Sequence, residues 1–145
     1  MQPIPMGQAP VDKRLIEVSD GVFAEAIFFN RPEKRVVCFS TQLTCSVGCK
    51  FCASPGPEKT VNLSADEMMK QIDSMLGENQ TAKTDNIILF SFMGEGEPFL
   101  NYKNVIEVMH RLEDRFGTNA NWPYRLLELH RIKLEPCRTK HFQFR

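Results

Sequence analysis

The chain has 145 residues, of which 18 are basic and 18 acidic, so its formal net charge is zero. That length suits one domain with a modest core, and the balanced charge excludes a general attraction to nucleic acid or membrane surfaces. No apolar run is long enough to cross a bilayer. Five cysteines, an odd number, do not resemble a secreted disulfide framework, and the Pro-rich segment 1–10 lacks the order of a signal peptide. We therefore expect a cytoplasmic protein.

The first predicted elements form a short β-hairpin. Residues 1–14 are expected to be a flexible N-terminal lead. Apolar and β-branched residues then predict strands over 15–18 and 22–29, and Ser19-Asp20-Gly21 predicts the turn between them. The predicted core domain begins with this hairpin and runs from 15 to 117.

A third strand and a helix follow. A turn over 30–34 precedes an apolar strand over 35–40, which leads into a cysteine-rich loop. After that loop, Ser64 is a predicted N-cap, Glu67 completes a capping box, and Gly77 is a plausible helix end. The predicted buried stripe of this helix consists of Met68, Met69, Ile72, Met75 and Leu76.

The pattern then repeats. Residues 86–92 are nearly all apolar, as expected of a strand covered on both faces. Asn101 or Asn104 is predicted to cap a second helix that ends near Phe116, before Gly117. The order strand–loop–helix, twice over, predicts an α/β fold with parallel strands. Ligands bind at the carboxyl ends of such strands, so we expect the two strand-to-helix loops to face each other there.

The first of these loops carries three cysteines at close spacing. Cys45, Cys49 and Cys52 form C-x-x-x-C-x-x-C. Soft thiolates select zinc, copper(I) or iron–sulfur clusters, and a saturated site needs four protein ligands. Three thiols leave one metal corner open, where chemistry can occur.

Two other interpretations of the cysteines stay open. Their spacing also places them on one face of a helix, although the segment lies between a β-rich run and a Pro/Gly-rich loop. A zinc site completed by Cys38, Cys137 or a histidine is the stronger alternative.

Four segments together resemble the radical S-adenosylmethionine (SAM) enzymes. They are the stretch 38–52, the helix start Asn62-Leu63-Ser64-Ala65-Asp66-Glu67, the loop Phe92-Met93-Gly94-Glu95-Gly96-Glu97-Pro98, and Leu100-Asn101-Tyr102. The closest likeness is to the family that methylates an adenine carbon, C2 or C8, in 23S ribosomal RNA and transfer RNA. It covers about residues 15–116. The resemblance implies a partial radical-SAM (β/α) barrel, with two β/α units preceded by a short β-hairpin.

The resemblance also implies cofactors and ligands. Cys45, Cys49 and Cys52 would hold a [4Fe–4S] cluster, and Gly96 and Glu97 match the pair that binds SAM, whose methionine amine and carboxylate chelate the open iron. An electron from the cluster then cleaves SAM to a 5′-deoxyadenosyl radical, so an electron donor such as flavodoxin or ferredoxin is an expected partner. The glycines are expected to let backbone carbonyls approach SAM closely.

Two further positions match catalytic residues of that family. Cys38 matches a cysteine that resolves a covalent RNA–protein intermediate by forming a disulfide with a second, methyl-carrying cysteine. Glu25 matches a position assigned as proton acceptor. Considered alone, Cys38 would be a buried strand cysteine and Glu25 a solvated strand residue.

The chain is expected to be incomplete relative to that family. The family's N-terminal RNA-recognition domain, later SAM contacts and methyl-carrying cysteine have no match, and 118–145 is predicted to be a divergent basic tail that includes Cys137. We expect a truncated, RNA adenine methyltransferase-like enzyme. The alternatives are a non-catalytic iron–sulfur or zinc fragment and a radical SAM enzyme with another substrate. RNA is a partner by resemblance only; self-association or a complementary chain is expected because the second core strand would leave an open apolar edge.

Overall fold

The structure is a computed structural model, which describes residues 11–30, 34–50, 52, 59–77, 87–117 and 120–121. Their elements are, in chain order, β1 (Val11–Ser19), β2 (Val22–Asn30), β3 (Lys34–Phe39), β4 (Gln42–Thr44), β5 (Val61–Asn62), α1 (Ala65–Leu76), β6 (Ile87–Ser91), the 3₁₀ helix η1 (Pro98–Asn101), α2 (Tyr102–Phe116) and β7 (Ala120–Asn121). The predicted α/β class and the order of hairpin, strand, helix, strand and helix are confirmed.

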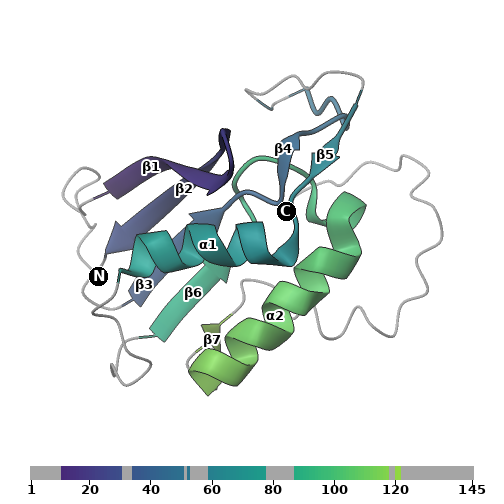
Figure 1. The fold of residues 1–145 in the computed structure, drawn as a ribbon. Coiled ribbons are helices and arrows are strands. Elements are labelled where there is room, and N and C mark those ends of the chain that lie inside the picture. The colour runs from purple at the N-terminus through teal and green to yellow at the C-terminus, as the bar shows by residue number, and fades with distance from the viewer. Residues whose placement is uncertain are drawn as a thin grey trace.

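A mixed five-stranded sheet forms the centre of the described fold, with the strand order β1-β2-β3-β6-β7. The hairpin β1–β2 and the pair β2–β3 are antiparallel, whereas β3, β6 and β7 run parallel. Figure 1 shows α1 and α2 on the same side of this sheet. The small pair β4–β5 is a separate two-stranded sheet that projects beyond it.

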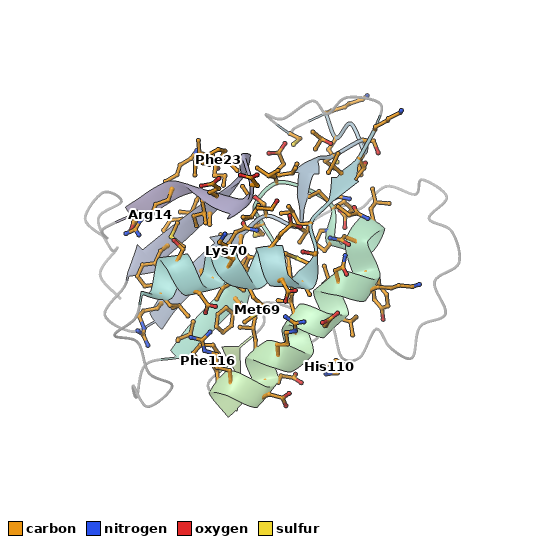
Figure 2. The ribbon with its side chains drawn as sticks, viewed as in Figure 1. Arg14, Phe23, Met69, Lys70, His110 and Phe116 are labelled. Carbon is orange, nitrogen blue, oxygen red and sulfur yellow. The ribbon has the colours of Figure 1, made fainter. Side chains whose placement is uncertain are left out.

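The core lies between the sheet and the two helices. Alternate residues of the strands point toward the helices, as the two-residue repeat of a strand requires. On the helical side, Phe116 of α2 packs against Phe90 of β6 with ring centroids 5.2 Å apart (Figure 2). The apolar core residues supplied by the strands are Ile16, Val18, Ala24, Ala26, Phe28, Val37, Phe39, Ile88 and Phe90. Those supplied by the helices are Ala65, Met68, Ile72, Met75, Leu76, Val105, Val108, Met109, Leu112 and Phe116.

The first and last residues of both helices lie where the sequence predicts them. The Ser64 side chain accepts the backbone N–H of Glu67, and the Glu67 carboxylate accepts the Ser64 N–H at 2.7 Å, which is a complete capping box. Gly77 and Gly117 follow α1 and α2 with positive φ angles of 72° and 58°. Asn101 precedes α2 but makes no side-chain cap bond, and its Oδ1 accepts the Asn104 Nδ2 at 2.8 Å instead.

Three features differ from the sequence prediction. β1 begins at Val11 rather than at residue 15, because Val11 pairs with Phe29 and the hairpin ladder continues to its open end. The pair β4–β5 was not predicted. β7, also unpredicted, pairs with β6 at Ile88 and Leu89, so part of the strand edge that we expected to be open is covered.

Several expectations fall outside the described residues. These include segment 1–10 of the predicted lead and nearly all of the predicted basic tail, with Cys137. None of the helices in the described part of the chain is long and apolar enough to cross a membrane.

Candidate cluster and cofactor site

The two loops predicted to carry the chemistry leave the sheet side by side. β3 and β6 are parallel neighbours, and Cys38 near the end of β3 pairs with Ser91 at the end of β6. After β3 comes the cysteine arm, which we define as residues 42–62, with β4 and β5 at its base. After β6 comes the cofactor loop, residues 94–98. The expected juxtaposition of the two loops at one sheet edge is confirmed.

Hydrogen bonds hold the two sides of the cysteine arm together next to its first cysteine. The Thr44 hydroxyl donates to the Lys59 carbonyl at 2.8 Å and accepts the Val61 N–H at 3.2 Å. One residue beyond Cys45, the Ser46 N–H donates to the Thr60 hydroxyl at 3.2 Å. The point where the arm opens into the cysteine motif is therefore fixed on both strands.

The three predicted cluster ligands all lie on this arm. Cys45 is half-buried, while Cys49 and Cys52 are exposed. The Cys52 N–H donates to the Cys49 carbonyl at 3.0 Å, so a tight turn joins these two residues. In the part of the chain that the structure describes, no group of three or more His, Cys, Asp or Glu side chains is arranged to hold a metal ion. The donor set suits a soft metal, and the assignment of the three ligands stays a prediction.

The cofactor loop is fastened to the base of the cysteine arm. The Glu95 carbonyl accepts the N–H groups of Thr41 at 2.9 Å and Gln42 at 3.2 Å. The Gly94 N–H donates to the Phe39 carbonyl at 3.1 Å, and the Glu95 N–H donates to the Ser40 hydroxyl at 2.9 Å. These bonds join residues more than 50 positions apart in the sequence, so the spacing of the two loops is set by direct contact.

The glycines of the cofactor loop are required by this contact. A Cβ on Gly94 would lie 2.5 Å from the backbone of Phe39 and Ser40. A Cβ on Gly96 would lie 2.7 Å from the Gln42 Cβ and the Thr41 Oγ1, and Gly96 also has a φ of 109°. We expected glycine here so that the backbone could approach a ligand. The structure adds a different reason, which is the close approach of protein to protein.

Glu97 uses both its backbone and its side chain. Its N–H donates to the Gln42 Oε1 at 2.8 Å. Its carboxylate Oε1 accepts the Phe99 N–H at 3.1 Å and so caps η1. A carboxylate has about four lone-pair sites, so this cap leaves capacity for an ammonium group. The loop residues fit a bound amine on that ground.

Glu25 and Cys38 lie on the sheet face opposite the helices. Cys38 pairs with Ile27, and Glu25 is two residues before Ile27, so the two side chains share that face in neighbouring rows. The Glu25 carboxylate makes a salt bridge of 2.7 Å with Lys13 on the exposed surface of the sheet. Burial raises the pKa of the Cys38 thiol, and a hydrogen bond with Ser91 partly offsets the rise.

Among the residues of this site, Glu95 and Ser91 were missed by sequence reasoning. Burial, and secondarily the negative charge of Glu25, raises the pKa of Glu95. The position of Glu95 inside the Gly-Glu-Gly-Glu-Pro motif was the available signal. Ser91, the neighbour of Cys38, had no signal in the sequence, because its role depends on strand pairing.

Two candidate fourth ligands of the zinc alternative lie outside the cysteine arm. Cys38 lies within β3 on the sheet, not on the cysteine arm. His110 lies on an exposed side of α2 and points away from the sheet (Figure 2). The other candidates, His130, His141 and Cys137, lie outside the described residues.

Known proteins resemble this chain over most of its length. The family model of a 4Fe-4S single cluster domain matches residues 32–142. The probable dual-specificity RNA methyltransferase RlmN of Dictyoglomus thermophilum is 34% identical over 113 residues, which are 78% of this chain and 32% of that protein. The protein of the same description from Finegoldia magna is 40% identical over 110 residues, 75% of this chain and 30% of that protein.

A solved structure also resembles this chain over most of its length. The crystal structure of a radical SAM methyltransferase from Sphaerobacter thermophilus matches with a TM-score of 0.55 and 29% sequence identity, over 81% of this chain and 36% of that chain. The chain thus spans about a third of the length of the proteins it matches.

Proposed function

We propose a function that starts from the family of this chain. The chain belongs to the radical SAM family of [4Fe–4S] domains, and it is a partial, RlmN-like segment. The proposal is that Cys45, Cys49 and Cys52 hold the cluster and that SAM binds beside Gly96 and Glu97. The observation that carries it is the bonding of the Glu95 carbonyl to the base of the cysteine arm. A ligand that must touch both a cluster and the cofactor loop needs this fixed spacing.

Different residues would bind the cluster and SAM. Three thiolates leave one iron without a protein ligand, and the amine and carboxylate of SAM suit that position. The Glu97 carboxylate, oriented by its bond to the Phe99 N–H, would attract the SAM amine. When bound, the cluster supplies the electron that cleaves SAM reductively. The protein's part is to hold SAM against it and to exclude water.

We further propose that the described core is part of a (β/α) barrel. The parallel strands β3 and β6, each followed by a helix on the same sheet face, have the arrangement of two β/α units. The face without helices, which carries Glu25 and Cys38, would then be the inner face of the barrel. Substrate on that face would meet the radical formed at the nearby cofactor loop.

The substrate class is proposed from the relatives. Proteins described as RNA methyltransferases match most of this chain, so RNA adenine is the first candidate, with Cys38 as the resolving cysteine and Glu25 as the proton acceptor. An electron donor such as flavodoxin or ferredoxin would reduce the cluster. For these 145 residues alone we expect no RNA methylation, because no cysteine matches the methyl carrier, and at most SAM cleavage to 5′-deoxyadenosine.

Anaerobic reconstitution tests the central claim. The chain should be loaded with iron and sulfide, and its reduced form examined by electron paramagnetic resonance (EPR) with and without SAM. We expect about four irons per chain, the number in one cluster, and an EPR signal that changes when SAM is added. Cys49→Ala should lose most of the iron, whereas the matched control Cys38→Ala should keep it.

Two results would contradict this function. Stoichiometric zinc without iron after anaerobic purification would favour the zinc module. An EPR signal that SAM leaves unchanged would reject the open-iron site and leave a non-catalytic iron–sulfur fragment.

A further inference from the structure

A buried three-residue segment runs from the end of β3 into the first residue of the cysteine arm. Ser40, Thr41 and Gln42 are fully buried although all three are polar. Burying polar groups is costly unless they are hydrogen-bonded. The partners of this segment therefore show which parts of the fold it connects.

On one side, the segment is tied to helix α1. The Gln71 Oε1 accepts the Ser40 N–H at 2.9 Å, and the Gln71 Nε2 donates to the Ser40 carbonyl at 3.0 Å. On the other side it is tied to η1, because the Asn101 Nδ2 donates to the carbonyls of Thr41 at 2.7 Å and Leu63 at 2.6 Å. Asn101 thus bonds the chain both where it enters and where it leaves the cysteine arm.

Gln42 makes a different connection, from the arm to the cofactor loop. Its Oε1 accepts the Glu97 N–H at 2.8 Å. Its Nε2 donates to the Asn62 Oδ1 at 2.6 Å, and the Asn62 Nδ2 donates to the Leu100 carbonyl at 3.2 Å. The chain of bonds runs from Glu97 through both strands of the arm base and returns to η1.

The Cβ and Cγ of Gln42 also lie close to the cofactor loop. A Cβ placed on Gly96 would lie 2.7 Å from the Gln42 Cβ and 2.8 Å from its Cγ. Gln42 therefore supports Gly96 by contact and Glu97 by a hydrogen bond. Gly96 and Glu97 are the two residues proposed to bind SAM. Gln42 lies outside the Gly-Glu-Gly-Glu-Pro motif that contains them.

We propose that Gln42 is a positioning residue for the SAM site, which fixes Gly96 and Glu97 relative to the cysteine arm through its amide and its stem. This inference rests on the proposed function. Gln42 does not touch SAM; it acts by holding the two residues that do.

The test compares two buried glutamines in the reconstituted chain. Gln42→Met and Gln71→Met each replace a fully buried amide that makes bonds on both its atoms with an apolar side chain of similar size. Both should lower stability, but only Gln42→Met should weaken SAM binding. Leaving the Glu97 N–H unpaired predicts a dissociation constant for SAM raised on the order of tenfold, with iron content unchanged.

A second pair of variants keeps the test decisive if Gln42→Met folds poorly. Asn62 is exposed, so its replacement perturbs the core less. Asn62→Ala removes the acceptor that orients the Gln42 amide and should weaken SAM binding about two- to threefold, as expected of an indirect loss. Asn62→Asp keeps that acceptor and, like Asn62→Ala, loses the bond to the Leu100 carbonyl, so it should bind SAM more tightly than Asn62→Ala does.

Amide hydrogen exchange gives a readout without SAM. In Gln42→Met, residues 94–101 should exchange faster than in Gln71→Met. If Gln42→Met binds SAM as well as Gln71→Met does, or if the cofactor loop exchanges equally in both, Gln42 has no positioning role. If the unaltered chain holds its cluster but binds no SAM, the proposed function fails instead, and this inference fails with it.

Discussion

Gly96 has two independent reasons to be a glycine. Its φ of 109° lies in a region that side chains disfavour, and its missing Cβ makes room for Gln42 and Thr41. Gly21, Gly48, Gly77 and Gly117 meet only the first condition. Gly77 has a φ of 72°, and nothing lies within 4 Å of the position its Cβ would take. A comparison of Gly96 with Gly77 therefore separates the requirement for a positive φ from the requirement for space.

Alanine at these two positions should therefore have unequal effects. Gly77→Ala is expected to lose only the energy of a strained backbone, whereas Gly96→Ala adds overpacking against a buried segment, typically about 1–3 kcal/mol. Urea unfolding of both variants would measure the difference. Equal losses would mean that the cofactor loop moves freely away from the cysteine arm, contrary to its bonds with Thr41 and Gln42.

The reactivity of Cys38 should depend on Ser91. Burial raises the pKa of this thiol, and the Ser91 hydrogen bond lowers it, so removing the hydroxyl should raise the pKa further. In Ser91→Ala, alkylation of Cys38 by iodoacetamide should then require a higher pH, because the thiolate is the reacting form. Peptide-level mass spectrometry across a pH series measures the pH midpoint of alkylation for Cys38 separately from the other cysteines. Ser74→Ala, on an exposed position of α1, is the control, and an unshifted pH midpoint in Ser91→Ala would refute the prediction.

Helix α1 is joined to the β-hairpin at its first turn. The Glu67 carboxylate closes the capping box with Ser64 and also accepts the hydroxyl of Ser19, the last residue of β1, at 2.8 Å. The backbone N–H of Ser64 is the largest cause that lowers the pKa of Glu67 below its ordinary value of 4.5. One side chain thus starts the helix and ties it to the sheet.

This lowered pKa fixes the sign of a pH effect. A carboxyl group whose pKa is depressed by folding stabilises the protein above its unfolded pKa, and the contribution is lost as the pH falls through the folded value. Glu67→Gln should therefore be less stable than the unaltered chain at pH 7 and converge with it as the pH falls below the lowered pKa of Glu67. Thermal unfolding at several pH values checks this. Glu107→Gln, in the middle of α2, should show a smaller difference, since its partner Arg111 is on an exposed surface.

The helices were the best predicted elements, because their ends are encoded locally. Ser64, Glu67, Gly77 and Gly117 act within a few residues of the helix that they begin or end. β4, β5 and β7 have two or three residues each and exist only through pairing with distant segments. Strands that short have too few residues to show a repeat, so the sequence did not predict them.

The candidate site divides in the same way. The cysteine motif and the Gly-Glu-Gly-Glu-Pro loop were predicted, because each is a contiguous pattern. The residues that connect them were not, because Gln42 reaches Glu97 and Asn101 reaches Thr41 across more than 50 positions. A polar residue that will be buried looks like any surface polar residue until its long-range partners are known. Asn101 was predicted only as a helix cap, a bond that it does not make.

The two faces of the sheet differ in the part of the chain that the structure describes. One face is covered by α1 and α2 (Figure 1). The other carries Leu15 and Phe23, which are 71% and 53% exposed, together with the half-buried Ile27 and Cys38. Since β7 covers part of the β6 edge, the exposed apolar surface is this open face more than the strand edge. Exposed apolar side chains on such a face favour association.

Self-association through the open face is therefore the last expected outcome. Sedimentation velocity should show species larger than the monomer as the concentration of the chain rises, and Leu15→Lys with Phe23→Lys should shift the distribution toward monomer. Leu15 pairs with Glu25 across the hairpin, so a lysine there faces a carboxylate and is compatible with the strand. Val61→Lys on β5 changes an exposed apolar residue away from that face and should not alter the distribution. Equal effects of the two sets of changes would mean that association is driven by general hydrophobicity, and a chain that stays monomeric at high concentration would show that the open face does not bind its own copies.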